Sequence, residues 1–184
     1  MLTLISDFFI RHAKGWIILL AFLAMAVCKL VLFPYMSALM NSATPGVGSF
    51  DTKLFYGPDQ AYSMLEAYGQ DARRAYMVGE LTVDILFPIA YTLFLTLSIS
   101  WLLQRAFDKE GSIQLLNLVP LGAWFFDLLE NTGIVIMLAM FPAFSTLAAI
   151  LTSFFSAIKW GFALVSIITL LFGFVAYIAK RIRG

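Results

Sequence analysis

Residues 113–140, IQLLNLVPLGAWFFDLLENTGIVIMLAM, form an apolar run with two acidic residues, Asp127 and Glu130, near its middle. The run is long enough for a helix to cross the hydrocarbon core of a bilayer, which takes about 20 residues. An ionised side chain near the bilayer centre costs at least roughly 2.5 to 3.5 kcal/mol, so it persists where it faces a bundle interior, has a partner or does chemistry. The stretch therefore predicts both a membrane-spanning helix and a site within it.

Three other stretches share this design of a long apolar run interrupted by an ionisable side chain. They cover about residues 15–36 with Lys29, 76–103 with Asp84, and 145–179 with Lys159. The chain is 61% apolar and only 12% charged, a balance outside the range of soluble domains. The sequence predicts an all-α polytopic membrane protein, with residues 1–184 forming one four-helix transmembrane domain.

The segments between the spans predict two short helices and a loop. Residues 2–12 place apolar side chains at helical spacing and predict an interfacial helix before the first span. Pro34, followed by the polar turn-rich residues 41–48, predicts the end of the first span. Residues 59–68 predict a short amphipathic helix on the membrane surface, which Gly69 would terminate.

Basic residues are distributed unequally between the two sides of the four predicted spans. Seven lie on the side of the termini, and three lie on the other side: Arg11, Lys14, Arg105, Lys109, Lys180, Arg181 and Arg183 against Lys53, Arg73 and Arg74. Cytoplasmic flanks carry the excess of lysine and arginine. We therefore expect an inner-membrane protein with both termini cytoplasmic and residues 37–75 extracytoplasmic.

Composition excludes several functions. A net charge of +1, without a basic face, gives no case for nucleic-acid binding. The single cysteine, Cys28, excludes an intramolecular disulfide. With one histidine, His12, at an interface, we expect no cofactor and no haem, zinc or iron–sulfur site. A carboxylate-bound cation such as magnesium or calcium is the metal class left open, although we assign no metal ligands.

Polar side chains recur at helical spacing within three of the spans, so each predicted helix carries a polar stripe. The stripes are Asp84, Pro88 and Tyr91; Asp127, Glu130 and Asn131; and Thr152, Ser156 and Lys159. Pro88 removes a backbone hydrogen bond and predicts a kink that widens the bundle beside Asp84. All four spans, including the first with Lys29, are expected to contribute to one interior site.

The buried ammonium group of Lys159 needs a counter-charge at its own depth. The acidic residues available there are Asp84, Asp127 and Glu130. We expect the Lys159 amine within about 6 Å of at least one of these carboxylates, the range over which an opposite charge strongly favours ionisation.

Three stretches resemble a family of small four-span bacterial membrane proteins. The motifs are G-x-x-x-R-x-x-Y, D-x-x-F-P-x-x-Y, D-x-x-E-N and a lysine in the last span, carried by residues 56–91, FFDLLENTGI (125–134) and SAIKWG (156–161). The resemblance supplies no reaction. It implies one functional unit made of Arg73, Tyr76, Asp84, Pro88, Tyr91, Asp127, Glu130, Asn131 and Lys159.

The favoured function is binding of a lipid-like or amphipathic small molecule, among membrane lipids, in a polar cavity open to the outer leaflet and capped by helix 59–68. Ligand-binding candidates are Lys29, Arg73, Tyr76, Tyr91 and Asn131. If the protein is an enzyme, Asp127 and Glu130 form the acid/base pair, Asp84 orients, Lys159 stabilises an anion and Arg73 contacts a headgroup. The alternatives are a structural or accessory subunit whose ion pairs fix helix packing, or a proton or ion pathway. A homo-oligomer is compatible with the sequence.

Overall fold

The computed structural model describes residues 1–43, 47–108 and 111–183, with residues 40–43 described by their backbone alone. Four helical stretches are long and apolar enough to cross a membrane: 15–39, 69–106, 112–140 and 146–183. The described part of the chain is helical and contains no strand. The predicted four-helix membrane bundle is therefore confirmed. Residues 44–46 of the predicted loop, and Lys109 with Glu110, lie outside the described residues.

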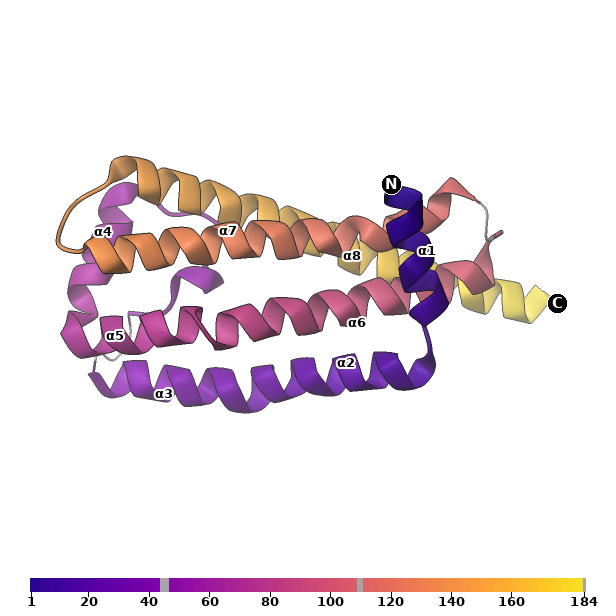
Figure 1. Cartoon of the computed structure of the whole chain (residues 1–184), viewed down its shortest axis with the longest axis horizontal. Coiled ribbons are helices and arrows are strands. Elements are labelled where there is room, and N and C mark those ends of the chain that lie inside the picture. The colour runs from indigo at the N-terminus through magenta and orange to yellow at the C-terminus, as the bar shows by residue number, and fades with distance from the viewer. Residues whose placement is uncertain (44–46, 109–110, 184) are drawn as a thin grey trace.

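The elements, in chain order, are α1 (Leu2–His12), α2 (Gly15–Val27), the π-helical turn η1 (Cys28–Leu32), α3 (Phe33–Ala43), the 3-10 turn η2 (Phe50–Thr52), α4 (Pro58–Ala67), α5 (Gly69–Glu80), α6 (Val83–Ala106), the 3-10 helix η3 (Ser112–Leu118), α7 (Val119–Met140) and α8 (Thr146–Arg183). Figure 1 shows α2–α3, α5–α6 and α7 running along the long axis of the molecule. Helices α1 and α4 cross its opposite ends, which we call the α1 end and the α4 end. Both chain termini lie at the α1 end.

The first span does not end at Pro34, as the sequence predicted, but continues through α3 to Ala43. Proline lacks a backbone N–H, and its ring collides with the carbonyl four residues earlier in a regular helix. The wider π-helical turn Cys28–Leu32 comes directly before it, and the N–H of Phe33 bonds to the carbonyl of Cys28. A π-turn changes the local hydrogen-bonding pattern, which lets the helix accommodate Pro34 without stopping.

The second span begins earlier than predicted, because α5 and α6 form one helical stretch from residue 69 to residue 106. A turn at Leu81 and Thr82 separates the two helices. Asp84 therefore lies in the first turn of α6, where the positive end of the helix dipole favours a carboxylate. The sequence predicted a kink at Pro88, but Pro88 lies inside the continuous helix α6, and the break in this span is the turn at Leu81 and Thr82.

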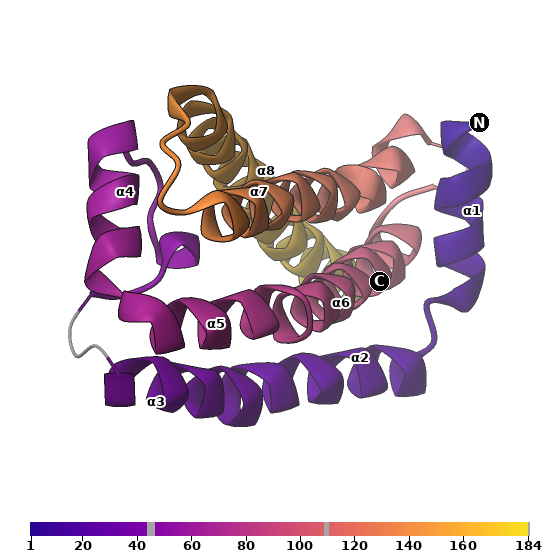
Figure 2. The ribbon, with the colours of Figure 1, turned by 60° about the vertical axis from the view of Figure 1, so that its left-hand side comes forward.

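Helices α7 and α8 approach each other closely at two glycines. A Cβ atom at Gly133 would lie 2.0 Å from Oγ1 of Thr152, and one at Gly122 would lie 2.4 Å from the ring of Phe162. Only the absence of a side chain allows these backbones to pack so tightly. Figure 2 shows α8 crossing α7 obliquely, so the two helices are in contact over much of the length of α7.

The two predicted short helices are both present. Helix α4 covers Pro58–Ala67, and Gly69, with a φ of +65°, follows its last turn. Its apolar face packs into the bundle, where Tyr62 and Leu65 belong to the same buried cluster as Met137. Helix α1 is fixed by Asn117, whose amide donates to the Ser6 carbonyl at 3.3 Å.

Candidate intramembrane polar site

An ion-paired cluster joins α7 to α8. Lys159 Nζ lies 3.4 Å from Asp127 Oδ1 and also forms a salt bridge with Glu130 Oε2. The two carboxylates are three residues apart on α7 and so face the same side of the helix. This confirms the prediction that Lys159 has a carboxylate partner. We call Asp127, Glu130 and Lys159 the ion-paired cluster.

The ion-paired cluster is buried unevenly. The side chain of Glu130 is fully enclosed, whereas those of Asp127 and Lys159 are each 10% exposed. Tyr91 on α6 donates to Asp127 Oδ2 at 3.0 Å, so both oxygens of this carboxylate have a partner. The predicted convergence of α6, α7 and α8 therefore occurs at Asp127.

Asp84 is connected to the same region through its backbone. Pro88 has no N–H to donate to the Asp84 carbonyl four residues earlier. The side-chain amide of Asn131 donates to this carbonyl at 2.6 Å. Asn131 lies next to Glu130 on α7, so the hydrogen bond ties α6 to α7 beside the ion-paired cluster. The predicted polar stripes of these two helices thus do meet.

Residues 47–57, which we call the inserted segment, place Phe50 and Tyr56 among the helices and leave Leu54 and Phe55 exposed. The sequence analysis did not predict this arrangement. The backbone N–H of Tyr56 donates to Ser153 Oγ, and Ser156 Oγ donates to the carbonyl of Lys53, both at 2.9 Å. Ser156 is ten residues from the start of α8, or roughly 15 Å along it at 1.5 Å per residue. The serines predicted as a polar stripe of α8 therefore hold this segment.

The inserted segment is also held by tyrosines. Tyr76 accepts a hydrogen bond from the Phe50 N–H at 2.9 Å and donates to Asp51 Oδ2 at 3.0 Å. Tyr68 donates to the carbonyl of Gly48 at 2.7 Å. Burial, with the nearby charges of Asp51 and Glu80, raises the pKa of Tyr68 above its ordinary value. Residues 50–56 (FDTKLFY) give only a partial sequence signal for this burial, because Phe50 and Tyr56 are enclosed while Leu54 and Phe55 are exposed.

Two predicted site residues lie elsewhere. Lys29 is exposed, and its Nζ lies 5.4 Å from the centroid of the Phe33 ring and 5.9 Å from that of Phe87 on α6, so it is not enclosed in the bundle interior as expected. Arg73 donates to the Leu65 carbonyl at 2.7 Å and lies over the ring of Phe141. It thereby fixes α4 to the bundle. Neither residue has a described contact with the ion-paired cluster.

Lys29 and Arg73 differ from the other candidates for separate physical reasons. The buried residues of the first span, Ala21 and Cys28, are seven positions apart, and Lys29 is one position, or about 100° of rotation, away from their face of the helix. Arg73 donates to a carbonyl in the last turn of α4 that has no partner within the helix. Predicting this contact requires knowing how the chain folds back after α4. Tyr76, in turn, holds the inserted segment rather than a ligand.

Comparisons with protein-family models, curated proteins and solved structures find no match to this chain. The resemblance to the four-span bacterial family thus stays a prediction. The fold and the site define the class of protein: a multi-pass α-helical membrane bundle with a buried ion-paired cluster between its last two helices.

Proposed function

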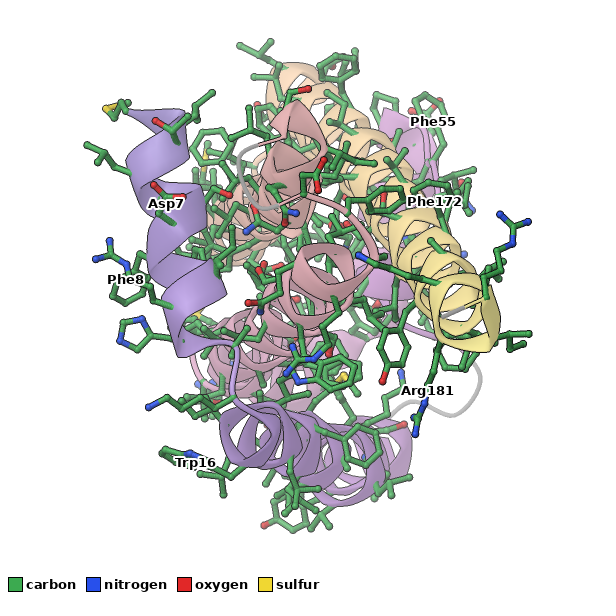
Figure 3. The ribbon with its side chains drawn as sticks, turned by 90° about the vertical axis from the view of Figure 1, so that its right-hand side faces the viewer. Asp7, Phe8, Trp16, Phe55, Phe172 and Arg181 are labelled. Carbon is green, nitrogen blue, oxygen red and sulfur yellow. The ribbon has the colours of Figure 1, made fainter. Side chains whose placement is uncertain are left out.

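We propose that this chain is an inner-membrane protein that binds an amphipathic, lipid-like molecule at the ion-paired cluster. In this proposal both termini are cytoplasmic, and the α4 end faces the outer side. Figure 3 looks onto the α1 end, where Trp16 near the start of α2 and Arg181 near the end of α8 are labelled. The basic residues that flank the spans on this side support a cytoplasmic α1 end.

The proposal rests on the partial exposure of two oppositely charged side chains, Asp127 and Lys159, among apolar side chains. The side chains of Asp127 and Lys159 are slightly exposed, while Glu130 behind them is closed. Phe126 stacks on Phe162, at 5.7 Å between centroids, on the same two helices. Trp160, beside Lys159, is exposed on α8. An amphipathic molecule would place its polar group against the charges and its chains against the aromatic rings.

A second candidate function is favoured by a different observation. Lys159 already has both of its carboxylate partners, and the inserted segment hydrogen-bonds to α8 nearby. Such a complete set of contacts also describes a structural lock that fixes the packing of α7 and α8. Buried ion pairs can set specificity of packing without contributing to ligand binding.

Native mass spectrometry of the full chain released from detergent separates the two candidates. The probe is phosphatidylglycerol and phosphatidylethanolamine added to delipidated protein. We expect the wild type to retain one lipid, and Asp127→Asn, which removes the exposed carboxylate and keeps the Glu130–Lys159 pair, to lose it while remaining folded. Lys180→Met is the matched control, because Lys180 is an exposed cation near the end of α8.

The outcomes are distinct. Retention by the control together with loss in Asp127→Asn supports the proposed site. No lipid retained by the wild type, combined with unfolding of Asp127→Asn, supports the structural lock. Equal retention by the wild type and Asp127→Asn places any bound lipid elsewhere and contradicts the proposal.

A further inference from the structure

A second group of acidic side chains lies beyond the ion-paired cluster. Asp51 of the inserted segment, Glu80 at the end of α5 and Asp84 at the start of α6 each offer a carboxylate oxygen, and these oxygens all lie within 4.8 Å of one another. We call them the acidic triad. Three segments of the chain meet at the acidic triad. Three carboxylates this close repel one another unless a group of opposite charge lies between them.

The charges of the acidic triad are not balanced by a basic side chain. Among the described residues, the recorded salt bridges pair only Lys159 with Asp127 and Glu130. Like charges this close repel, and removal from water adds to the cost of each. A positively charged group between the three oxygens would reduce both the repulsion and the cost of removing the carboxylates from water.

Glu80 points to a ligand independently of the clustering. It is only 1% exposed, and neither of its carboxylate oxygens has a hydrogen-bond partner among the described residues. Tyr76 does not fill this need, because its single proton is donated to Asp51 Oδ2. A buried carboxylate without a partner is costly, and a bound cation would supply the missing partner at this position.

Two neighbouring oxygens are likewise unpartnered. Asn131 uses its amide nitrogen to hold the Asp84 backbone, which leaves its Oδ1 without a partner. The hydroxyl of Tyr56, in the inserted segment, is buried and has none either. The unpartnered groups recorded beside the acidic triad among the described residues are thus oxygens, and the carboxylates and the Asn131 amide oxygen are acceptors.

We propose that the acidic triad binds one divalent cation of the hard, oxygen-preferring class, with Ca²⁺ the best match. Ca²⁺ takes oxygen ligands at roughly 2.3 to 2.6 Å, so ligands on opposite sides of the ion lie up to roughly 5 Å apart. The oxygens of the acidic triad lie within 4.8 Å of one another and so fit this range. Mg²⁺, at roughly 2.0 to 2.1 Å, would need the oxygens drawn closer together. The three clustered ligand atoms are all carboxylate oxygens, which disfavours softer metals.

The exposure of these residues indicates how a cation would enter the site, and their positions indicate which segments it would join. Asp51 is only half-buried, whereas Glu80 is enclosed, so a cation would enter past Asp51 and be held against Glu80. Since Asp51 belongs to the inserted segment and Glu80 and Asp84 lie on either side of the α5–α6 turn, the cation would join that segment to the turn. This inference rests on residues other than the ion-paired cluster.

Equilibrium dialysis of the full chain in detergent tests the proposal. Chelator-treated protein is dialysed against CaCl₂, MgCl₂ or MnCl₂ at neutral pH, and bound metal is quantified by mass spectrometry. We expect one saturable cation per chain, with Glu80→Gln weakening its affinity at least tenfold. Asp59→Asn is the matched control, because Asp59 is an exposed carboxylate on α4, and it should bind as the wild type does.

Thermal unfolding provides a second readout. At 100-fold excess over the dissociation constant, the cation should raise the wild-type midpoint by roughly 5 to 10 °C. Glu80→Gln should lack this shift and, in chelator, unfold at or above the wild-type temperature, since one unpaired carboxylate is gone. If it fails to fold, Asp51→Asn takes its place. Absence of saturable binding of all three cations to the wild type, or binding by Glu80→Gln equal to the wild type, overturns the proposal.

Discussion

Asn131 on α7 donates its side-chain amide to the backbone oxygen of Asp84 on α6, at 2.6 Å. This carbonyl lacks its helical partner because residue 88 is proline. The Asn131 side chain of α7 therefore replaces the backbone donor that Pro88 removes from α6. The contact explains why a proline is tolerated inside α6 next to the site.

Asn131→Ala should lower the free energy of unfolding by about 1 to 3 kcal/mol, because the Asp84 carbonyl is left buried and unsatisfied. Pro88→Ala restores a backbone N–H four residues from that carbonyl. The double variant should recover much of the loss, as measured by a double-mutant cycle in detergent. Thr132→Ala, an exposed neighbour on α7, serves as the control. Strictly additive losses would contradict the compensation.

Lys159→Met should lower the free energy of unfolding by about 3 to 5 kcal/mol, because it leaves Asp127 and Glu130 as uncompensated buried charges. Adding Glu130→Gln removes one of those charges and should restore part of the stability. Chemical unfolding followed by circular dichroism measures both. Lys180→Met should be close to neutral. A Lys159→Met variant as stable as the wild type would show that the pair contributes nothing to packing.

Tyr76→Phe should loosen the inserted segment, since it removes the partner of the Phe50 N–H and of Asp51. We expect a loss of about 1 to 3 kcal/mol and faster tryptic cleavage after Lys53. Tyr35→Phe, at an exposed tyrosine of α3, should leave the cleavage rate unchanged. The idea fails if Lys53 is cut equally fast in all three proteins.

The orientation is tested by cysteine labelling in a Cys28→Ala background. Cysteine at Gln60, exposed on α4, should react with a membrane-impermeant maleimide in intact cells, whereas cysteine at exposed Ser112 should react only after lysis. Gln60 is a better position than Ser49, because Ser49 is hydrogen-bonded to Asp51 within the inserted segment. The reverse labelling pattern would place the termini outside.

Stability at alkaline pH should depend on Tyr68. The unfolded chain releases the tyrosine proton near pH 10, whereas burial holds the folded pKa higher, so stability is full below about pH 10 and declines above it. Tyr68→Phe should be less stable at about pH 8, because the bond to Gly48 is gone, yet decline less steeply above pH 10. Tyr177→Phe, in the last turns of α8, is the control. Parallel declines in all three proteins would exclude this role.

Sequence periodicity was sufficient to predict the spans and most of the ion-paired cluster. Asp127, Glu130 and Lys159 lie on regular helices, so spacing alone gives the face on which each occurs. Periodicity failed at Lys29, because the first span is apolar on all faces and gives no sign of which face is buried, and at the predicted end of that span, because η1 lets the helix continue past Pro34. The grouping of Asp51 with Glu80 and Asp84 was missed for another reason. Their proximity depends on where an irregular segment folds back, and no helical period encodes that.

The inserted segment constrains the order in which the molecule is assembled during synthesis. Its partners Ser153 and Ser156 lie 97 and 103 residues later in the chain, on α8. Until α8 leaves the ribosome, the backbone N–H of Tyr56 and the carbonyl of Lys53 lack these serine partners and must stay in contact with water. The first three spans can therefore enter the membrane in sequence, but residues 47–57 reach their final position only after α8 has been made.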